Sequence, residues 1–269
     1  MIYYKTPEEI EKIRASCLIV SKTLALAGSL LKPGVTGKEL DRQAEQFIRD
    51  SGGIPVFKGF HGFPGSLCIS INEQVVHGIP GDASIEDGDI VSIDCGVNID
   101  GFIGDAAFTF AVGNVSEETI KLLEVTRTCL KRGIDQAREG NRIGDIGFAV
   151  QDYAERQNGY GVVRELVGHG VGIDLHEPPE VPNYGKRGKG IKIKEGMVIA
   201  IEPMINLGKR QVRTLADGWT IISRDKKPSA HYEHTIAVTA NGPDPLSDHS
   251  FAEEASKNNP ELQEISLKN

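Results

Sequence analysis

The stretch of sequence that decides the fold is DCGVNIDGFIGD, residues Asp94–Asp105. Asp100-Gly101 near its middle is a strong signal for a two-residue β-turn between two strands, because both residues tolerate positive φ. A hairpin closed by this turn places Asp94 opposite Ala107 and Asp105 opposite Gly96. The two aspartates then lie on one face of the hairpin as diagonal neighbours, about 7–8 Å apart.

The two carboxyl groups are expected to be largely desolvated, because the residues around them are apolar. These neighbours are Ile93, Cys95, Phe102 and Phe108. Two buried carboxylates without an obvious Lys or Arg partner are costly unless they are protonated or bind cations. The pair therefore indicates a cation site, and a solvated face of an edge hairpin stays open as the alternative.

The chain before the hairpin predicts two helices and then strands. Thr6-Pro7-Glu8-Glu9 is a capping box with Pro at the first helical position, and apolar residues recur at three- and four-residue steps up to Leu31. A second helix starts at Thr36 and ends at Gly52-Gly53. Runs of β-branched and aromatic residues predict strands over Leu67–Ile71, Asp89–Ile93 and Phe102–Val112.

The same order of elements repeats after the hairpin. One helix starts at Ser116 and ends near Gly140, and a shorter helix spans Asp145–Gln157. Two similar α+β halves that bury one shared sheet explain this order better than a parallel sheet with alternating helices. The strands predicted for the second half are Gly161–Val167, Met197–Ile201, Gly218–Ser223 and Tyr232–Thr239.

Composition excludes several classes of protein. The 269 residues carry 38 acidic and 30 basic side chains, a formal net charge of −8, which argues against a nucleic-acid-coating or polybasic membrane-surface protein. The four widely spaced cysteines indicate reduced thiols rather than a disulfide framework or a structural zinc site. We see no signal-peptide pattern and no run near the roughly 18 apolar residues of a membrane helix, so we expect a cytoplasmic protein without membrane contact.

Three further polar residues stand out by their positions. Val198–Ile201 is a continuous apolar run typical of a buried strand, and Glu202 follows it directly before a proline, which holds the glutamate extended. Glu233 alternates with its neighbours inside the predicted strand Tyr232–Thr239. His169 lies in a glycine-flanked turn, where the backbone can pack closely around the imidazole.

Together with the two hairpin aspartates, these residues supply four carboxylates and one imidazole. An oxygen-rich set with one nitrogen and no thiolate suits a pair of divalent ions such as Mn, Fe, Co or Zn. Two such ions would offset the four carboxylate charges and generate a hydroxide nucleophile near neutral pH. The set therefore predicts a hydrolytic dimetal centre.

Several segments resemble the type I methionine aminopeptidases, in the same order and with similar spacing from about Met1 to Pro245. The resemblance implies an α+β fold of the pita-bread type, with two pseudo-symmetric halves and a central antiparallel sheet flanked by helices. We therefore expect one catalytic domain over residues 1–247. The polar composition of residues 248–269 predicts a C-terminal tail that is flexible or only loosely docked. The matching segments are Asn72–Pro80, Asp94 with Asp105, Gly168–Gly172, Ile201–Met204 and Tyr232–Thr235.

The resemblance implies a role for each proposed ligand. Asp94 resembles a ligand of one metal, and His169 and Glu202 resemble ligands of the other. Asp105 and Glu233 are similar to the two residues that bridge both ions. The counterpart of Glu202 is also discussed in the family as a proton-transfer group.

The resemblance also implies residues that contact the substrate. His77 resembles a catalytic histidine near the substrate amine or the scissile nitrogen. His176 resembles a histidine that hydrogen-bonds the scissile carbonyl oxygen and stabilises developing negative charge. The expected walls of the pocket for the methionine side chain are Phe57, Phe60, Phe63, Cys68, Leu175 and Trp219.

The implied function is removal of the initiator methionine from nascent proteins whose second residue is small. Two metal ions per chain activate a hydroxide that attacks the first peptide bond. We further expect a monomer that binds no specific nucleic acid and associates transiently with the ribosome.

Three other functions stay open. X-Pro aminopeptidases and prolidases share the ligand set but usually carry a large N-terminal domain, for which the sequence leaves no room. Type II methionine aminopeptidases carry a helical insertion between the counterparts of His169 and Glu202, whereas only 33 positions separate the two residues here, which favours type I. A metal-free binding protein of the same fold typically loses ligand side chains, and all five are kept here.

Overall fold

The first half of the molecule consists of two helices packed on an antiparallel sheet, as seen in the computed structural model, which describes residues 1–265. The expected N-terminal capping box is present at Thr6. Thr36 caps the second helix by accepting a hydrogen bond from the Glu39 amide. The elements of this half are α1 (Pro7–Leu30), α2 (Gly37–Asp50), β1 (Ile54–Pro55), β2 (Leu67–Ile71), β3 (Gln74–Val76), β4 (Ile90–Ile99) and β5 (Phe102–Ala111), with a 3₁₀ turn at Phe60–Gly62.

The hairpin of β4 and β5 has the predicted register. Asp94 lies opposite Ala107 and Asp105 lies opposite Gly96. Asp100 and Gly101 have φ of 51° and 84°, the left-handed pair that a two-residue hairpin turn requires. The prediction that both aspartates share one face of the hairpin is therefore confirmed.

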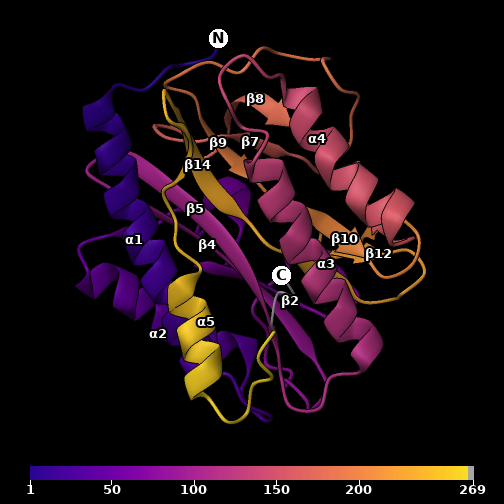
Figure 1. The fold of residues 1–269 in the computed structure, drawn as a ribbon. Helices are drawn as coiled ribbons and strands as arrows, with labels where there is room; N and C mark the ends of the chain where they lie inside the picture. The colour runs from indigo at the N-terminus through magenta and orange to yellow at the C-terminus, as the bar shows by residue number, and fades with distance from the viewer. Residues whose placement is uncertain (266–269) are drawn as a thin grey trace.

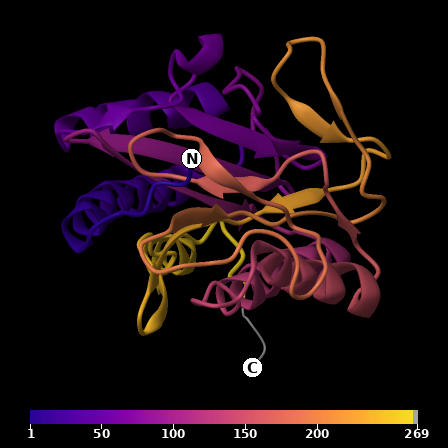
Figure 2. The same cartoon turned by 90° about the horizontal axis from the view of Figure 1, so that it is seen from above.

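The second half repeats the order of helices and strands. Its helices α3 and α4 lie at the right of Figure 1, whereas α1, α2 and the C-terminal α5 lie at the left. Seen from above, α1, α3, α4 and α5 lie on one side of the strands (Figure 2). The elements are α3 (Glu117–Ile134), α4 (Ile143–Gln151) with a π-helical last turn (Asp152–Gln157), β6 (Gly161–Val162), β7 (Gly168–Gly170), β8 (Glu177–Val181), β9 (Val198–Ile201), β10 (Met204–Asn206), β11 (Val212–Thr214), β12 (Ile221–Ser223), β13 (Ser229–His231), β14 (His234–Thr239), β15 (Gly242–Pro245) and α5 (Ser250–Asn258).

The strands pair antiparallel as expected but differ from the prediction in four details. Among residues 1–265 they divide into four small antiparallel sheets, because short strands pair locally and then twist away from one another. The predicted strand Gly161–Val167 ends at Val162, and His169 lies in β7 rather than in a turn. Glu233 precedes β14 instead of lying inside it, because its amide is bonded to β5.

The two halves meet where β5 lies beside the segment that leads into β14. We call this contact between residues 105–109 and 231–235 the seam. The Glu233 amide donates to the Ala107 carbonyl over 2.9 Å, and the Thr235 hydroxyl donates to the Asp105 carbonyl over 2.7 Å. The seam therefore fixes the backbone of Asp105 beside that of Glu233.

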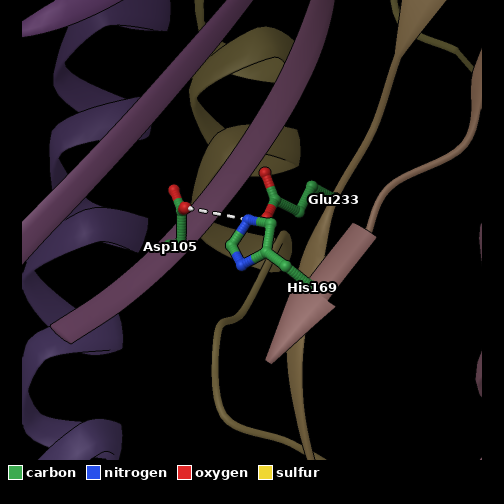
Figure 3. A group of neighbouring side chains, drawn as sticks. All are labelled: Asp105, His169 and Glu233. Atoms are coloured by element: carbon green, nitrogen blue, oxygen red, sulfur yellow. Dashed lines mark ion pairs between the residues drawn. The ribbon is translucent and has the colours of Figure 1, made fainter. Parts of the chain in front are cut away.

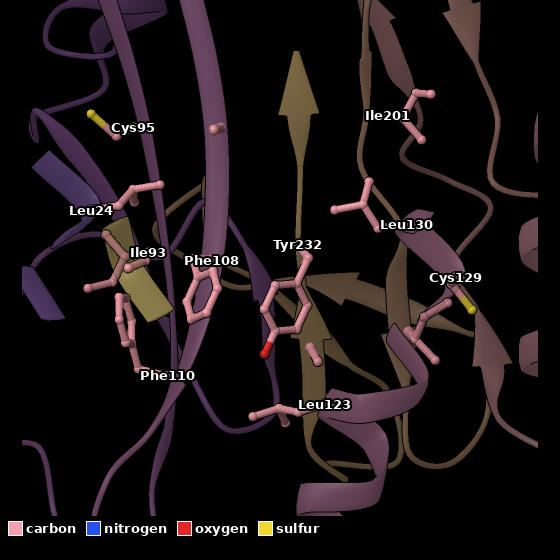
Figure 4. Close-up of a cluster of buried hydrophobic side chains, with 14 of the residues drawn as sticks. Leu24, Ile93, Cys95, Phe108, Phe110, Leu123, Cys129, Leu130, Ile201 and Tyr232 are labelled. Carbon is pink, nitrogen blue, oxygen red and sulfur yellow. The ribbon is translucent and has the colours of Figure 1, made fainter. Parts of the chain in front are cut away.

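The hydrophobic core continues across the seam. The rings of Phe108 and Tyr232 meet edge to face, with their centroids 5.0 Å apart. Figure 4 shows this pair in the middle of the core, with Leu24 of α1 on one side and Leu130 of α3 on the other. The two halves thus share one core and bury their helices against it.

The C-terminal segment differs from the expected flexible tail. α5 packs against α1 with Ala252 and Ser256 buried. The Asn259 amide group donates to the carbonyls of Gly28 and Leu31 at the end of α1, over 2.9 and 2.7 Å. The polar composition suggested a tail, but a helix needs only a narrow apolar stripe to dock. Residues 266–269 of the expected tail lie outside the described residues.

α1 is long and apolar enough to cross a membrane by length and composition alone, the only such helix among residues 1–265. Half of its apolar window is buried inside the protein, against β4, β5 and α5. The core therefore accounts for its apolar residues. We assign α1 as a core helix.

Thr6→Ala tests the cap of α1. In the structure the Glu9 amide donates to Thr6 Oγ1 over 3.3 Å, and the Thr6 amide donates to the Glu9 carboxylate over 2.8 Å. Loss of the hydroxyl leaves a helix-terminal amide without its acceptor, so we expect the free energy of unfolding to fall by about 1 kcal/mol. Urea unfolding measures the change, and Thr6→Ser, which keeps the hydroxyl, serves as the control. Equal stability of Thr6→Ala and the unmodified chain would contradict the assignment.

Candidate active site

Every residue that the sequence singled out as a site residue lines one cavity of about 380 Å³. The cavity lies beside the seam, and both halves contribute to its walls. No Lys or Arg occurs among the described residues that line it. The predicted residues found there are Asp94, Asp105, His169, Glu202, Glu233, His77, His176, Phe57, Phe60, Phe63, Cys68, Leu175 and Trp219.

Asp94 and Asp105 enter the cavity from the hairpin. Asp105 is 3% exposed. Burial raises the pKa of Asp94 to about 7. Burial and the neighbouring Asp94 carboxylate together raise the pKa of Asp105 well above its ordinary value. At neutral pH the pair therefore resists carrying two negative charges without a cation.

Glu202 and Glu233 approach the cavity from the second half. Glu202 follows β9 directly, and Asn183 donates to its backbone carbonyl over 2.9 Å. Glu233 is held by its amide at the seam and is 2% exposed. Burial, followed by the nearby carboxylates, raises the pKa of both groups well above the usual range. Four carboxyl groups with raised pKa values thus share one enclosed space.

His169 faces these carboxyl groups from β7. Its Nδ1 lies 2.9 Å from the Gly170 carbonyl, and because a carbonyl only accepts, Nδ1 carries the hydrogen. Burial lowers the pKa of His169 to about 4, so the ring is neutral and Nε2 presents a lone pair. Nε2 lies 3.4 Å from Glu202 Oε1 and 3.9 Å from Asp105 Oδ2, as Figure 3 shows for Asp105.

Close packing explains the glycines beside His169. A Cβ on Gly168 would lie 2.3 Å from the Ala200 carbonyl oxygen, and one on Gly170 would lie 2.5 Å from that of Pro178. Real Cβ atoms do not approach a carbonyl oxygen so closely, so only glycine lets β7 lie between its neighbours. The glycines thus place the imidazole through steric fit rather than through a turn.

The donor set fits divalent cations. One oxygen of each of Asp94, Asp105 and Glu233 is buried without a hydrogen-bond partner among the described residues. Ligand atoms of Asp105, His169 and Glu233 lie within 4.8 Å of one another. A neutral imidazole lone pair that faces carboxylate oxygens is repulsive unless a proton or a cation lies between them, and the three oxygens without partners leave room for a cation. The residues present therefore suit a metal bound by oxygen and one nitrogen.

Two further histidines lie on the rim and wall of the cavity. Burial lowers the pKa of His77 to about 4, and this residue has a φ of 58°. His176 is exposed at the rim, with its ring centroid 4.4 Å from that of His169 and 5.4 Å from that of Phe60. Both imidazoles are therefore available for hydrogen bonds to a ligand in the cavity.

Aromatic rings form the apolar end of the cavity. Phe63 and Trp219 meet edge to face with centroids 5.1 Å apart. Phe57 is buried against Gly96, where a Cβ would lie 2.8 Å from the Phe57 ring. Cys68 lies opposite Asp94 in the β2–β4 ladder, so it reaches the same face. An apolar side chain that enters the cavity would meet rings and a thiol next to the carboxyl cluster.

Sequence reasoning gave no role to His231 or Asn183. His231 is buried, and its Nε2 lies 3.7 Å from Glu202 Oε2. Burial, then His77, lowers the pKa of His231 to about 3. Its place two residues before Glu233 in an extended segment was a usable signal, because such residues share a face. Asn183 carried no comparable signal.

The chain is similar to characterised peptidases over most of its length. The model of metallopeptidase family M24 matches residues 11–240. Methionine aminopeptidase of Clostridium perfringens is 52% identical over 246 residues, 91% of this chain and 98% of that relative. Methionine aminopeptidase 1 of Bacillus subtilis is 51% identical over 246 residues, 91% and 99% of the two chains.

Solved structures agree with the sequence comparison. The crystal structure of methionine aminopeptidase from Rickettsia prowazekii has a TM-score of 0.90 and 41% identity, and the match covers 92% of this chain and all of that one. This likeness confirms the predicted pita-bread fold. The chain therefore belongs to metallopeptidase family M24 and, within it, to the methionine aminopeptidases.

Proposed function

We propose that the protein removes the initiator methionine from nascent proteins whose second residue is small, and that this cavity is the active site. One observation carries the proposal: four buried carboxyl groups and a neutral imidazole converge next to an aromatic pocket in a single cavity. The carboxyl groups and the imidazole suit metal-assisted hydrolysis, and the aromatic pocket suits an apolar, unbranched side chain. The preference for a small second residue is a prediction from the resemblance.

The donor set supports two divalent ions per chain. Asp94 would hold one ion, and His169 with Glu202 would hold the other. Asp105 and Glu233, which the seam fixes side by side, would bridge the two. Carboxylate and imidazole ligands fit Co, Mn, Fe and Zn alike, so the choice among them depends on availability and geometry.

The residues around the ions supply positioning and proton transfer. When bound, divalent ions supply Lewis acidity and activate water near neutral pH. His176 at the rim would donate to the scissile carbonyl oxygen and stabilise the negative charge that develops on it. Glu202, which also lies next to His231, would accept a proton from the attacking water and deliver it to the leaving amine. His77 would orient the substrate nitrogen.

The aromatic end of the cavity would bind the methionine side chain. A thioether against ring edges gains about 0.3–1.5 kcal/mol per contact, and Phe57, Phe63 and Trp219 offer such edges. Burial of the apolar side chain would then hold the N-terminal residue while the amine faces the carboxyl cluster.

We also propose a cytoplasmic monomer that meets its substrate at the translating ribosome. The β11–β12 hairpin supports the contact with the ribosome. The loop between its strands contributes Trp219 to the cavity, so a surface that binds the hairpin would lie next to the substrate site. Exposed basic residues around the hairpin suit a weak contact with an anionic surface. These residues are Lys209, Arg213, Arg224, Lys226 and Lys227.

Removal of metal should abolish the activity. Dialysis of the protein against a chelator is expected to stop cleavage of a Met-Ala-Ser peptide, and added Co²⁺, Mn²⁺ or Fe²⁺ is expected to restore it, because the buried carboxyl groups need cations to ionise. Released methionine is the measured product. A Met-Leu-Ser peptide should be cleaved much more slowly.

Two results would contradict the proposal. Undiminished cleavage by the chelated protein would exclude metal-assisted hydrolysis. Preferred cleavage of an Ala-Pro dipeptide over Met-Ala-Ser would favour the rival assignment as a prolidase.

Asp105→Asn tests the bridging position. The change removes one negative charge and one anionic ligand at the centre of the cluster, so we expect loss of bound metal and a fall in kcat of at least about 100-fold. Metal content is measured by elemental analysis and kcat with Met-Ala-Ser. Asp100→Asn is the matched control, because the turn position is exposed and asparagine tolerates its positive φ. Normal metal content in Asp105→Asn would refute the assignment.

His176→Ala tests the proposed carbonyl contact. Loss of one hydrogen-bond donor to a developing oxyanion typically lowers kcat by about 100-fold to 1,000-fold. We expect a change of that order in kcat with unchanged metal content. His61→Ala is the control, because His61 is an exposed neighbour that does not line the cavity. If both variants keep full kcat, His176 has no part in catalysis.

A further inference from the structure

The C-terminal segment packs behind the proposed metal ligands. We call residues 246–265 the strap. It follows β15, runs along α1 as α5 and returns to the end of β5, where the Gln263 amide donates to the Ala111 carbonyl over 2.9 Å. Figure 1 shows α5 in yellow against α1. The strap lies outside the residues 11–240 matched by the family model, so the family match carries no role for it.

His249 in the strap touches the backbone of Glu233. Its Nε2 lies 2.9 Å from the Glu233 carbonyl, and because the carbonyl only accepts, Nε2–H is the donor. The ring stacks on His234 with centroids 3.7 Å apart and an angle of 28°, and it meets the edge of Phe108 at 5.1 Å. Packing on two sides therefore fixes the direction of this hydrogen bond.

The residues before His249 hold the segment that follows Glu233. Ser247 Oγ lies 2.7 Å from His234 Nδ1 and accepts the Thr235 amide over 3.2 Å. The Leu246 amide donates to the Thr235 carbonyl over 2.8 Å. The strap thus satisfies backbone groups of both Glu233 and Thr235.

Glu233 is therefore held from two sides. β5 fixes its amide through the Ala107 carbonyl, and the strap fixes its carbonyl through His249. Because the peptide groups on both sides of Glu233 are anchored, the direction of its Cα–Cβ bond is fixed. That direction leads into the cavity, where one carboxylate oxygen is buried without a partner.

We propose that the strap positions Glu233 for metal binding and that His249 is the positioning residue. The inference rests on the proposed function, since it takes Glu233 as a metal ligand. Partners that orient a metal ligand typically change metal affinity by about 10-fold to 100-fold when they are removed. His249 contacts the backbone of Glu233 and does not itself line the cavity, so its effect is on the affinity of the site for metal and reaches catalysis only through occupancy.

Isothermal titration of the chelator-stripped full chain with Co²⁺ tests the proposal. His249→Phe keeps an aromatic ring against His234 and Phe108 but cannot donate, so its Kd for Co²⁺ should rise at least about 10-fold. His249→Gln places an amide N–H near the same point and should stay within about threefold of the unmodified chain. The activity of each variant at saturating Co²⁺ should return to the original kcat.

Glu253→Gln is the matched control. Glu253 lies one helical turn further along the strap and pairs with Arg127 rather than with Glu233. It should leave the Kd for Co²⁺ unchanged. A rise in Kd equal to that of His249→Phe would assign the effect to general loosening of the strap and overturn the role of His249.

The remaining outcomes separate the two proposals. Unchanged Co²⁺ affinity in a folded His249→Phe variant would overturn the inference and leave the proposed function intact. Failure of the unmodified chain to bind Co²⁺ would instead overturn the proposed function. If His249→Phe does not fold, Ser247→Ala replaces it, since it removes the neighbouring bonds to His234 and Thr235; an unchanged Kd there would equally count against the strap.

Discussion

Four carboxyl groups buried together are the constraint on which the rest of the structure depends. Removing one ionised group from water costs several kcal/mol even after the surroundings relax, and like charges add to that cost. No Lys or Arg among the described cavity residues offsets it. The protein must therefore either keep these groups protonated or bind cations between them. One oxygen of each of Asp94, Asp105 and Glu233 is buried without a partner among the described residues, beside the His169 lone pair, and this set suits cations.

Such a cluster needs a rigid frame, and the frame is distributed over the whole chain. The hairpin of β4 and β5 supplies two carboxyl groups, and the segments after β9 and before β14 supply the others. The seam joins the two halves through hydrogen bonds to the backbone carbonyls of Asp105 and Ala107. The rings of Phe108 and Tyr232 bury this contact in the shared core. Neither half contains the complete donor set. The helices on the outer side stabilise this arrangement without touching the cavity.

The sequence predicted what depends on local chemistry. The Asp100-Gly101 turn determined the hairpin register, and with it the shared face of Asp94 and Asp105, because a two-residue turn leaves no freedom in pairing. Every proposed site residue reached one cavity. The predictions that were wrong concern segments whose structure depends on residues far away in the sequence. Glu233 left the predicted strand because β5 binds its amide, and the polar strap docked because α1 offers a complementary face, neither of which any local pattern encodes.

The seam also sets the order in which the molecule can form. Asp105 and Thr235, which it joins, are 130 positions apart, whereas the hairpin closes between adjacent residues. Before contacts of such long range can form, the chain loses the entropy of closing the loop between them, so they form late and slowly. The hairpin can form early and carries its two aspartates unpaired until the second half arrives. Ion binding then acts on the folded state alone and adds to its stability by mass action. The seam therefore completes the fold and the donor set in the same step.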